Sequence, residues 1–68
     1  PPVEDGNVAV LRSILAGESD SAHLSLTLAT IEACVNALND AGLLTGDVEQ
    51  LAQDAITYWA NLDEKVNG

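Results

Sequence analysis

The two side chains best suited to form a nucleophilic pair, His23 and Cys34, are each the only residue of their type among 68 residues. An imidazole in contact with a thiol can activate it for attack. Both residues lie in one expected helix, however, and eleven residues of helix separate them by roughly 16 Å. Only an antiparallel partner chain could bring them together, so we interpret Cys34 as a small buried side chain. One cysteine and one histidine also fall short of a four-ligand zinc site.

A second polar group has the spacing of residues that share one helix face. It consists of Ser19, Asp20, His23 and Thr27. We prefer to interpret it as the hydrated first turn of a helix rather than as a catalytic cluster.

Carboxylates are the remaining candidates for chemistry, and their spacing does not favour a shared site. Asp47 and Glu49, like Asp63 and Glu64, stand so close in sequence that a helix points their side chains apart. The Glu-x-x-His pattern of di-iron bundles is absent, and the glycines are scattered rather than gathered in a phosphate-binding loop. We therefore predict no catalytic residue, no metal site and no cofactor, and we expect that the chain is not an enzyme.

The elements that must position these residues are helices. In the central segment, apolar residues recur at alternating intervals of four and three residues, which predicts an amphipathic helix over about residues 20 to 41. We call these residues the central seam: Leu24, Leu28, Ile31, Val35 and Leu38. Gly42 then fits the left-handed position that ends a helix, with Leu43 folding back against Leu38.

The third helix is expected over about residues 46 to 65. Thr45 or Asp47 is placed to cap its start, and the spacing of Asp47 and Gln50 resembles a capping box. Its apolar face is broad and includes the adjacent aromatic residues Tyr58 and Trp59. Neighbouring residues on a helix point about 100° apart, so one aromatic ring should enter the core while the other lies at its rim.

The first helix is expected over about residues 7 to 16, with a cap at Asp5 or Asn7 and an end at Gly17. It is too short to be stable alone, so it must dock on the other two helices. Their short connection makes those two an antiparallel αα-hairpin. The fold class predicted for residues 1–68, taken as one small domain, is therefore all-α.

The chain has more large apolar residues than three such helices are expected to enclose. The surplus predicts an interface. The simplest arrangement is a homodimer in which two hairpins form a four-helix bundle, with the short first helices lying across it. The predicted interface residues are Leu24, Leu28, Ile31, Val35, Leu38, Leu51, Ile56, Trp59 and Leu62. In this register Leu28→Asp and Ile31→Asp should abolish folding, whereas Thr27→Asp should be tolerated.

The net charge of −9, from eleven acidic residues against Arg12 and Lys65, narrows the range of partners. Binding to nucleic acids or anionic membranes requires clustered lysine and arginine, so both are disfavoured. A basic protein is favoured, although solubility alone would also explain the charge. A decoy that imitates nucleic acid would need carboxylates in rows, and these look dispersed around their helices.

The expected compartment follows from what the sequence lacks. It has no uninterrupted apolar run long enough to span a membrane and no basic segment followed by an apolar one. A single thiol fits a reducing compartment. We expect a cytoplasmic protein.

Two stretches, GESDSAHLSL before the central helix and LLTGDVEQLAQDAITYW near the end, make this acidic chain resemble acyl carrier proteins. That family attaches its prosthetic arm to a serine in an Asp-Ser-Leu motif at a helix start. Here Asp20 and Ser21 are followed by Ala22, and the family's long first loop and acidic stretch after the serine are missing. The resemblance implies that Ser21 would carry a phosphopantetheine arm.

These observations lead to one preferred function and one alternative. The preferred function is a small acidic helical module for protein–protein interaction and dimerisation, without catalytic activity of its own. The alternative is an acyl-carrier-like protein or a small non-catalytic subunit of an enzyme complex.

Overall fold

The computed structural model describes residues 4–17 and 24–67, and this part of the chain consists of three helices without strands. They are α1 (Gly6–Leu15), α2 (Leu24–Asp40) and α3 (Gly46–Asn67). The predicted all-α fold class is confirmed. Wherever their ends are described, the helices begin and end within two residues of the predicted positions.

Helix α1 has the two ends that its sequence predicts. Of the two candidate caps, Asp5 is the one used, because its Oδ1 accepts a 2.8 Å hydrogen bond from the backbone N–H of Asn7. At the other end Gly17 has a φ of +81°, and its N–H donates to the carbonyl of Ile14 over 3.1 Å. Glycine adopts this left-handed conformation at little cost. A residue in that conformation cannot continue a right-handed helix, so α1 ends there.

Helix α2 ends in a Schellman motif, with Gly42 in the predicted left-handed position. The N–H of Gly42, at φ +73°, donates to the carbonyl of Asn39 over 3.1 Å, and the N–H of Leu43 donates to the carbonyl of Leu38 over 2.8 Å. The Leu43 side chain, which was expected to fold back against Leu38, is 44% exposed. Leu44, the next residue, packs against the core instead.

Helix α3 corrects the predicted capping box. The side chain of Gln50 does not turn back to the helix start; its Nε2 donates to Oδ1 of Asp54, one turn further on, over 2.9 Å. The helix also continues to Asn67, beyond the predicted end. The Nδ2 of Asn67 donates to Oδ1 of Asp63 over 2.8 Å, which supports this last turn.

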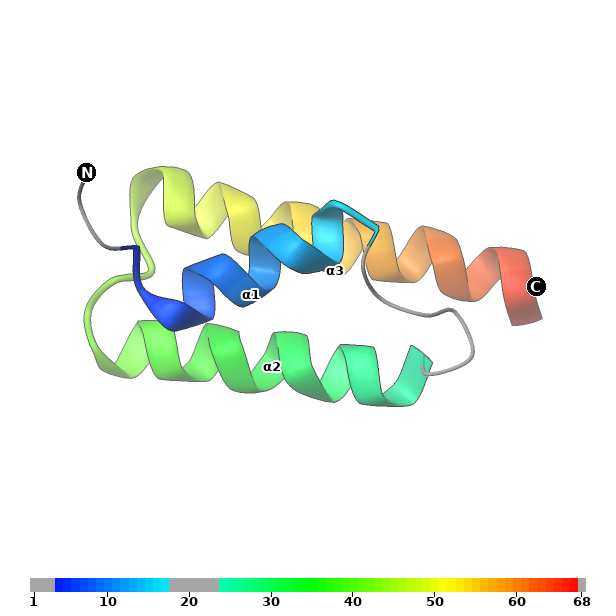
Figure 1. The fold of residues 1–68 in the computed structure, drawn as a ribbon, viewed down its shortest axis with the longest axis horizontal. Helices are drawn as coiled ribbons and strands as arrows, with labels where there is room; N and C mark the ends of the chain where they lie inside the picture. Colours follow the sequence, from blue (N-terminus) through cyan, green and yellow to red (C-terminus); the bar gives the residue numbers. More distant parts are fainter. Residues whose placement is uncertain (1–3, 18–23, 68) are drawn as a thin grey trace.

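The three helices pack against one another so that each contacts both of the others. Figure 1 shows α2 and α3 running side by side in opposite directions, with α1 lying across the pair. Helix α3 has 22 residues, about 33 Å of helix, and therefore extends over most of the 37 Å length of the molecule. Its last turns project beyond the first turn of α2 (Figure 1).

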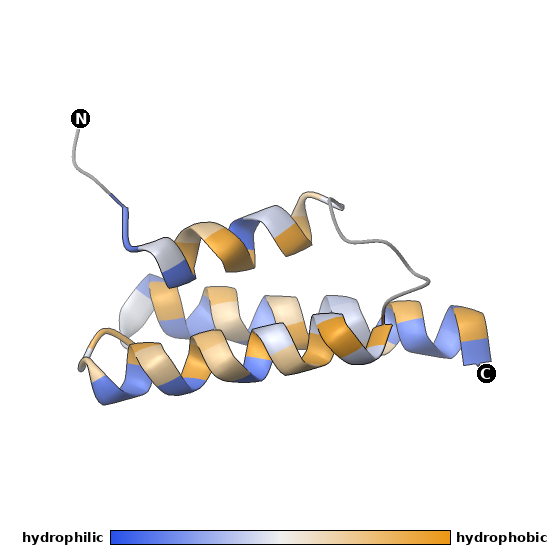
Figure 2. Cartoon of the chain, turned by 60° about the horizontal axis from the view of Figure 1, so that its bottom comes forward, coloured by the Kyte–Doolittle hydropathy of each residue, from blue (hydrophilic) through white to orange (hydrophobic). Residues whose placement is uncertain are grey.

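The core forms where the three apolar faces meet. Leu11 of α1, Ile31 and Leu38 of α2 and Ala55 of α3 are almost completely buried. In Figure 2 the apolar bands of α1 face the α2–α3 pair. Ile31 and Leu38, which were predicted to face a second copy, are thus covered by helices of their own chain.

The register of α2 differs from the predicted one. Its buried residues are Leu24, Thr27, Ile31, Cys34 and Leu38. Leu28 and Val35 of the central seam are only half-buried, whereas Thr27 is 6% exposed. The expectation that Thr27 lies off the core is therefore wrong. The buried face of α2 is thus turned toward Thr27 and Cys34, and Cys34 belongs to the same core cluster as Val8, Leu11 and Ile14 of α1.

Some large apolar side chains of the described residues remain at the surface. They are Val10, Leu26, Leu43, Ile56 and Val66. They belong to different helices and one loop rather than to a single continuous stripe along one helix. Within residues 4–17 and 24–67, no helix combines the length and apolar composition needed to cross a membrane.

Candidate functional site

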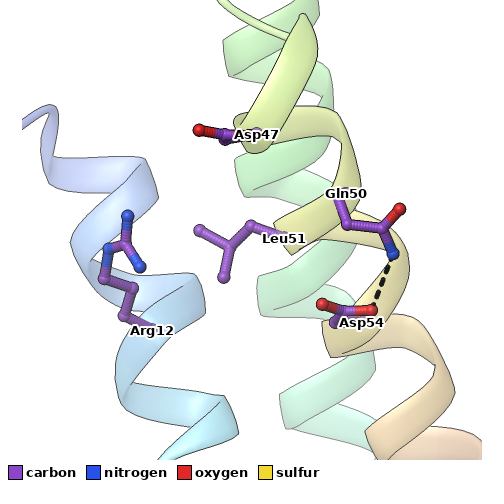
Figure 3. Close-up of a pocket in the computed structure, with 5 residues that line it drawn as sticks. All are labelled: Arg12, Asp47, Gln50, Leu51 and Asp54. Carbon is purple, nitrogen blue, oxygen red and sulfur yellow. Dashed lines mark hydrogen bonds between the residues drawn. The ribbon is translucent and has the colours of Figure 1, made fainter.

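A surface groove of about 320 Å³ lies between α1 and α3. Its lining residues are Arg12, Asp47, Gln50, Leu51 and Asp54. Figure 3 shows Arg12 on the α1 side and the other four side chains on α3, with Leu51 pointing across toward α1.

The α3 wall of the groove follows from helical spacing. Asp47, Leu51 and Asp54 are separated by four and then three residues, which places them along one flank of α3. Leu51 is half-buried and packs against the core, whereas the two carboxylates are exposed. The flank therefore presents an apolar surface between two negative charges.

The two carboxylates differ in their partners. Asp54 accepts the hydrogen bond from Gln50 (Figure 3). Asp47 has no hydrogen-bond or ion-pair partner among the described residues. It lies in the first turn of α3, where the helix dipole stabilises negative charge. Asp47 is thus held in a favourable place on the helix while its oxygens remain available.

The α1 wall carries the one cation near the groove. The Nε of Arg12 pairs with the carboxylate of Glu4, and the two side chains are 60% and 43% exposed. Such an exposed ion pair contributes only about 0–1 kcal/mol to stability. It nevertheless compensates the positive charge of Arg12 locally, so the groove is not dominated by that charge.

The groove carries groups that can bind cations. Two carboxylates and an amide can accept hydrogen bonds from cationic groups. Across the described parts of the chain, no three His, Cys, Asp or Glu side chains gather closely enough to hold a metal ion.

The thiol of Cys34 lies away from this groove, in the core. Burial raises its pKa, and the negative charge of Asp5 raises the pKa further. A protonated, buried thiol is a poor nucleophile. Cys34 therefore occupies the place of a small core residue, as its sequence context predicted.

The nine predicted interface residues divide into three groups. Leu24, Ile31 and Leu38 are buried inside their own chain, and Ile56 is 45% exposed. The other five are half-buried: Leu28, Val35, Leu51, Trp59 and Leu62. Of the nine, Leu51 is the one that lines the groove. A side chain that its own chain covers has no surface left for a second copy, so only the last two groups remain candidates for contact.

Both aromatic residues of α3 lie half-buried against the core, instead of one inside and one at the rim. The indole Nε1 of Trp59 donates a 2.7 Å hydrogen bond to the backbone carbonyl of Leu24. Trp59 thereby ties the first turn of α2 to α3, which accounts for its position. Ser19, Asp20, Ser21 and His23, which carried the polar-cluster and acyl-carrier interpretations, lie outside the described residues.

Sequence reasoning missed the groove. The spacing of Asp47, Leu51 and Asp54 is legible in the sequence, but it looks like an ordinary amphipathic flank. What makes it a groove is the wall on α1, including Arg12, and nothing in the sequence states which flank of α3 meets α1.

Comparison of the chain with family models, with curated protein sequences and with solved structures gave no match.

Proposed function

We propose that this chain is a non-catalytic protein-interaction module that binds a basic segment of another protein. The observation that supports the proposal is the distribution of charge. Of nine carboxylates in the described residues, eight are exposed, and the described cations are Arg12 and Lys65. Arg12 is already paired with Glu4. A surface of this kind steers a basic partner toward it and disfavours acidic ones.

The nature of the reactive groups supports the non-catalytic part of the proposal. The thiol of Cys34 is buried, with a raised pKa. Eight of the nine described carboxylates are exposed to solvent. Exposed carboxylates can recognise cations through charge and hydrogen bonds alone.

Titration calorimetry with a synthetic lysine-rich peptide tests the function. At an ionic strength of about 20 mM we expect saturable binding near one peptide per chain. At about 500 mM the affinity should fall strongly, because salt screens exposed charges. If the charge served solubility alone, the heats would show no saturation at a defined stoichiometry, and the proposal would be abandoned.

A homodimer is a second candidate, favoured by apolar side chains that one copy leaves at the surface. Leu26 is 64% exposed, Val66 54% and Ile56 45%. Sedimentation equilibrium at low and high salt distinguishes a second copy of the chain from a basic partner. Two copies that each carry a net charge of −9 repel each other, so a homodimer should strengthen as salt rises, whereas a basic partner should be released. A monomer at micromolar concentration under both conditions would argue against the dimer.

The acyl-carrier alternative depends on Ser21, so the intact mass of the protein from its native host tests it. A phosphopantetheine adduct that disappears in Ser21→Ala would replace the proposed function. An unmodified chain is the result expected from an interaction module.

A further inference from the structure

We propose that the groove between α1 and α3 is the docking site for the basic partner, and that it receives a helical segment carrying two cationic side chains with an apolar side chain between them. This inference rests on the proposed function and gives it a place and a ligand pattern. The occupant is defined by complementarity to the α3 wall, where the order is carboxylate, leucine, carboxylate.

The distance between Asp47 and Asp54 along α3 sets the spacing of the cationic residues in the ligand. Asp47 and Asp54 are seven residues apart, which is about 10.5 Å along α3. A helix laid alongside α3 meets both carboxylates when its own lysines or arginines are seven residues apart. An apolar residue midway between them then falls opposite Leu51, which is half-buried and still has surface to cover.

The two carboxylates of the groove still have hydrogen-bond acceptor sites for this ligand. Asp47 has no partner among the described residues, and Asp54 accepts a single hydrogen bond from Gln50. A carboxylate has two oxygens and several acceptor sites, so Asp54 can keep Gln50 and also accept from a cation. With about 320 Å³ between walls on only two helices, the groove suits side chains laid along it better than an enclosed small molecule (Figure 3).

Arg12 allows binding in the groove to be distinguished from a general effect of net charge. Its guanidinium lies on the wall facing Asp47 and Leu51, where it repels an incoming cation, although its pairing with Glu4 reduces this repulsion. Removing the charge of Arg12 should therefore strengthen docking. Lys65, near the end of α3, is the other described cation and provides a control with the same change in net charge.

The probe for the test is a helical peptide of roughly fourteen residues, stapled because so short a helix is marginal alone. It carries two lysines seven residues apart with a leucine between them. We expect Asp47→Asn combined with Asp54→Asn to weaken its binding by about tenfold. The control, Glu32→Gln combined with Asp40→Asn, removes the same charge from exposed positions of α2 and should weaken binding by about twofold. Arg12→Gln should strengthen binding more than Lys65→Gln does. Circular dichroism of each variant checks that the helices are retained.

The possible outcomes separate the site from the function. Equal weakening by the two double variants would overturn the groove while leaving a basic partner in place. Failure of the wild-type chain to bind the peptide at low salt would overturn both. Amide chemical shifts that change at Leu26 and Ile56 on adding protein rather than peptide would assign the contact surface to a second copy, against the groove. Shifts concentrated at the five lining residues on adding peptide would support the proposal.

Discussion

The two flanks of α2 differ in burial, and the difference runs against the hydropathy of their side chains. On one flank Thr27 and Cys34 are buried; on the other, Leu28 and Val35 are half-buried although they are larger and more apolar. Two patterns can be compared on α2, the predicted central seam and the observed buried face. Leu24, Ile31 and Leu38 belong to both patterns and are buried. Burial on this helix is therefore decided by where the neighbouring helices lie, not by the hydropathy of each side chain.

The flank of α2 that holds Cys34 contributes to the same core cluster as α1. Leu11 and Ile14 of α1 are large and buried, and the smaller Cys34 lies in the same core cluster. A close-packed interior requires this matching of large and small residues across an interface. Hydropathy alone would have selected the opposite flank.

The largest expected effect comes from the residues common to both patterns. Ile31→Asp should abolish folding, because a buried carboxylate without a partner costs several kcal/mol and so small a chain has little stability to lose. Loss of helical circular dichroism measures the effect. The adjacent exposed residue gives the control, since Glu32→Ala should change the free energy of unfolding by about 0.5 kcal/mol or less.

The next effect distinguishes the two flanks directly. Thr27→Asp should destabilise the chain by several kcal/mol, and Leu28→Asp by distinctly less, because Thr27 is buried and Leu28 is not. Urea unfolding followed through Trp59, the only tryptophan, gives both free energies. Thr27→Val keeps the volume and adds no charge, and should cost about 1 kcal/mol or less. Equal damage from the two aspartates would contradict the register described for α2.

A smaller effect is expected at the end of the same helix. Gly42→Ala should cost about 1 kcal/mol, because its positive φ strains any residue with a Cβ. Gly6→Ala is the matched control. Neither added Cβ meets an atom within 4 Å, but Gly6 lacks the positive φ and lies in α1, so alanine there should be neutral or stabilising by about 0.5 kcal/mol. Thermal unfolding that ranked the two variants alike would argue against a left-handed Gly42.

The smallest effect concerns the thiol on the buried flank. At pH 8 Cys34 should react with a thiol reagent about tenfold more slowly in the folded chain than in urea, because it is buried and its pKa is raised. A raised pKa also means that the folded state resists ionisation. Stability should therefore fall slightly as the pH rises above about 8.5 and be unaffected by this group at lower pH. In a Cys34→Ser background, Val35→Cys should react faster, since that position is only half-buried.

Local chemistry predicted much of the fold because the relevant interactions are short in range. Asp5 caps α1 and Gly42 terminates α2 through contacts within a few residues, and the capping and terminating residues could be read from their types. The capping box predicted for α3 is wrong because two local partners competed for one side chain. Gln50 had two local partners available, and the sequence could not rank Asp54 against the helix start.

The candidate site was less predictable because its walls come from residues far apart in the chain. Asp47, Leu51 and Asp54 have legible helical spacing, but Arg12 joins them only through the packing of α1 on α3. The hydrogen bond from Trp59 to the backbone of Leu24 is similar, since the two residues are 35 positions apart. No local pattern specifies such a pairing.

The amino-acid sequence by itself determined that the chain is helical, where most of its helices start and stop, and that its surface is strongly acidic, because periodicity, caps and charge depend on residue types and near neighbours. Only the tertiary structure decided that the Thr27 and Cys34 flank of α2 faces the core, and that α1 and α3 form the walls of a groove with two carboxylates. Those features depend on how side chains of unequal size fit together across helices, and this fit is a property of the packed molecule as a whole.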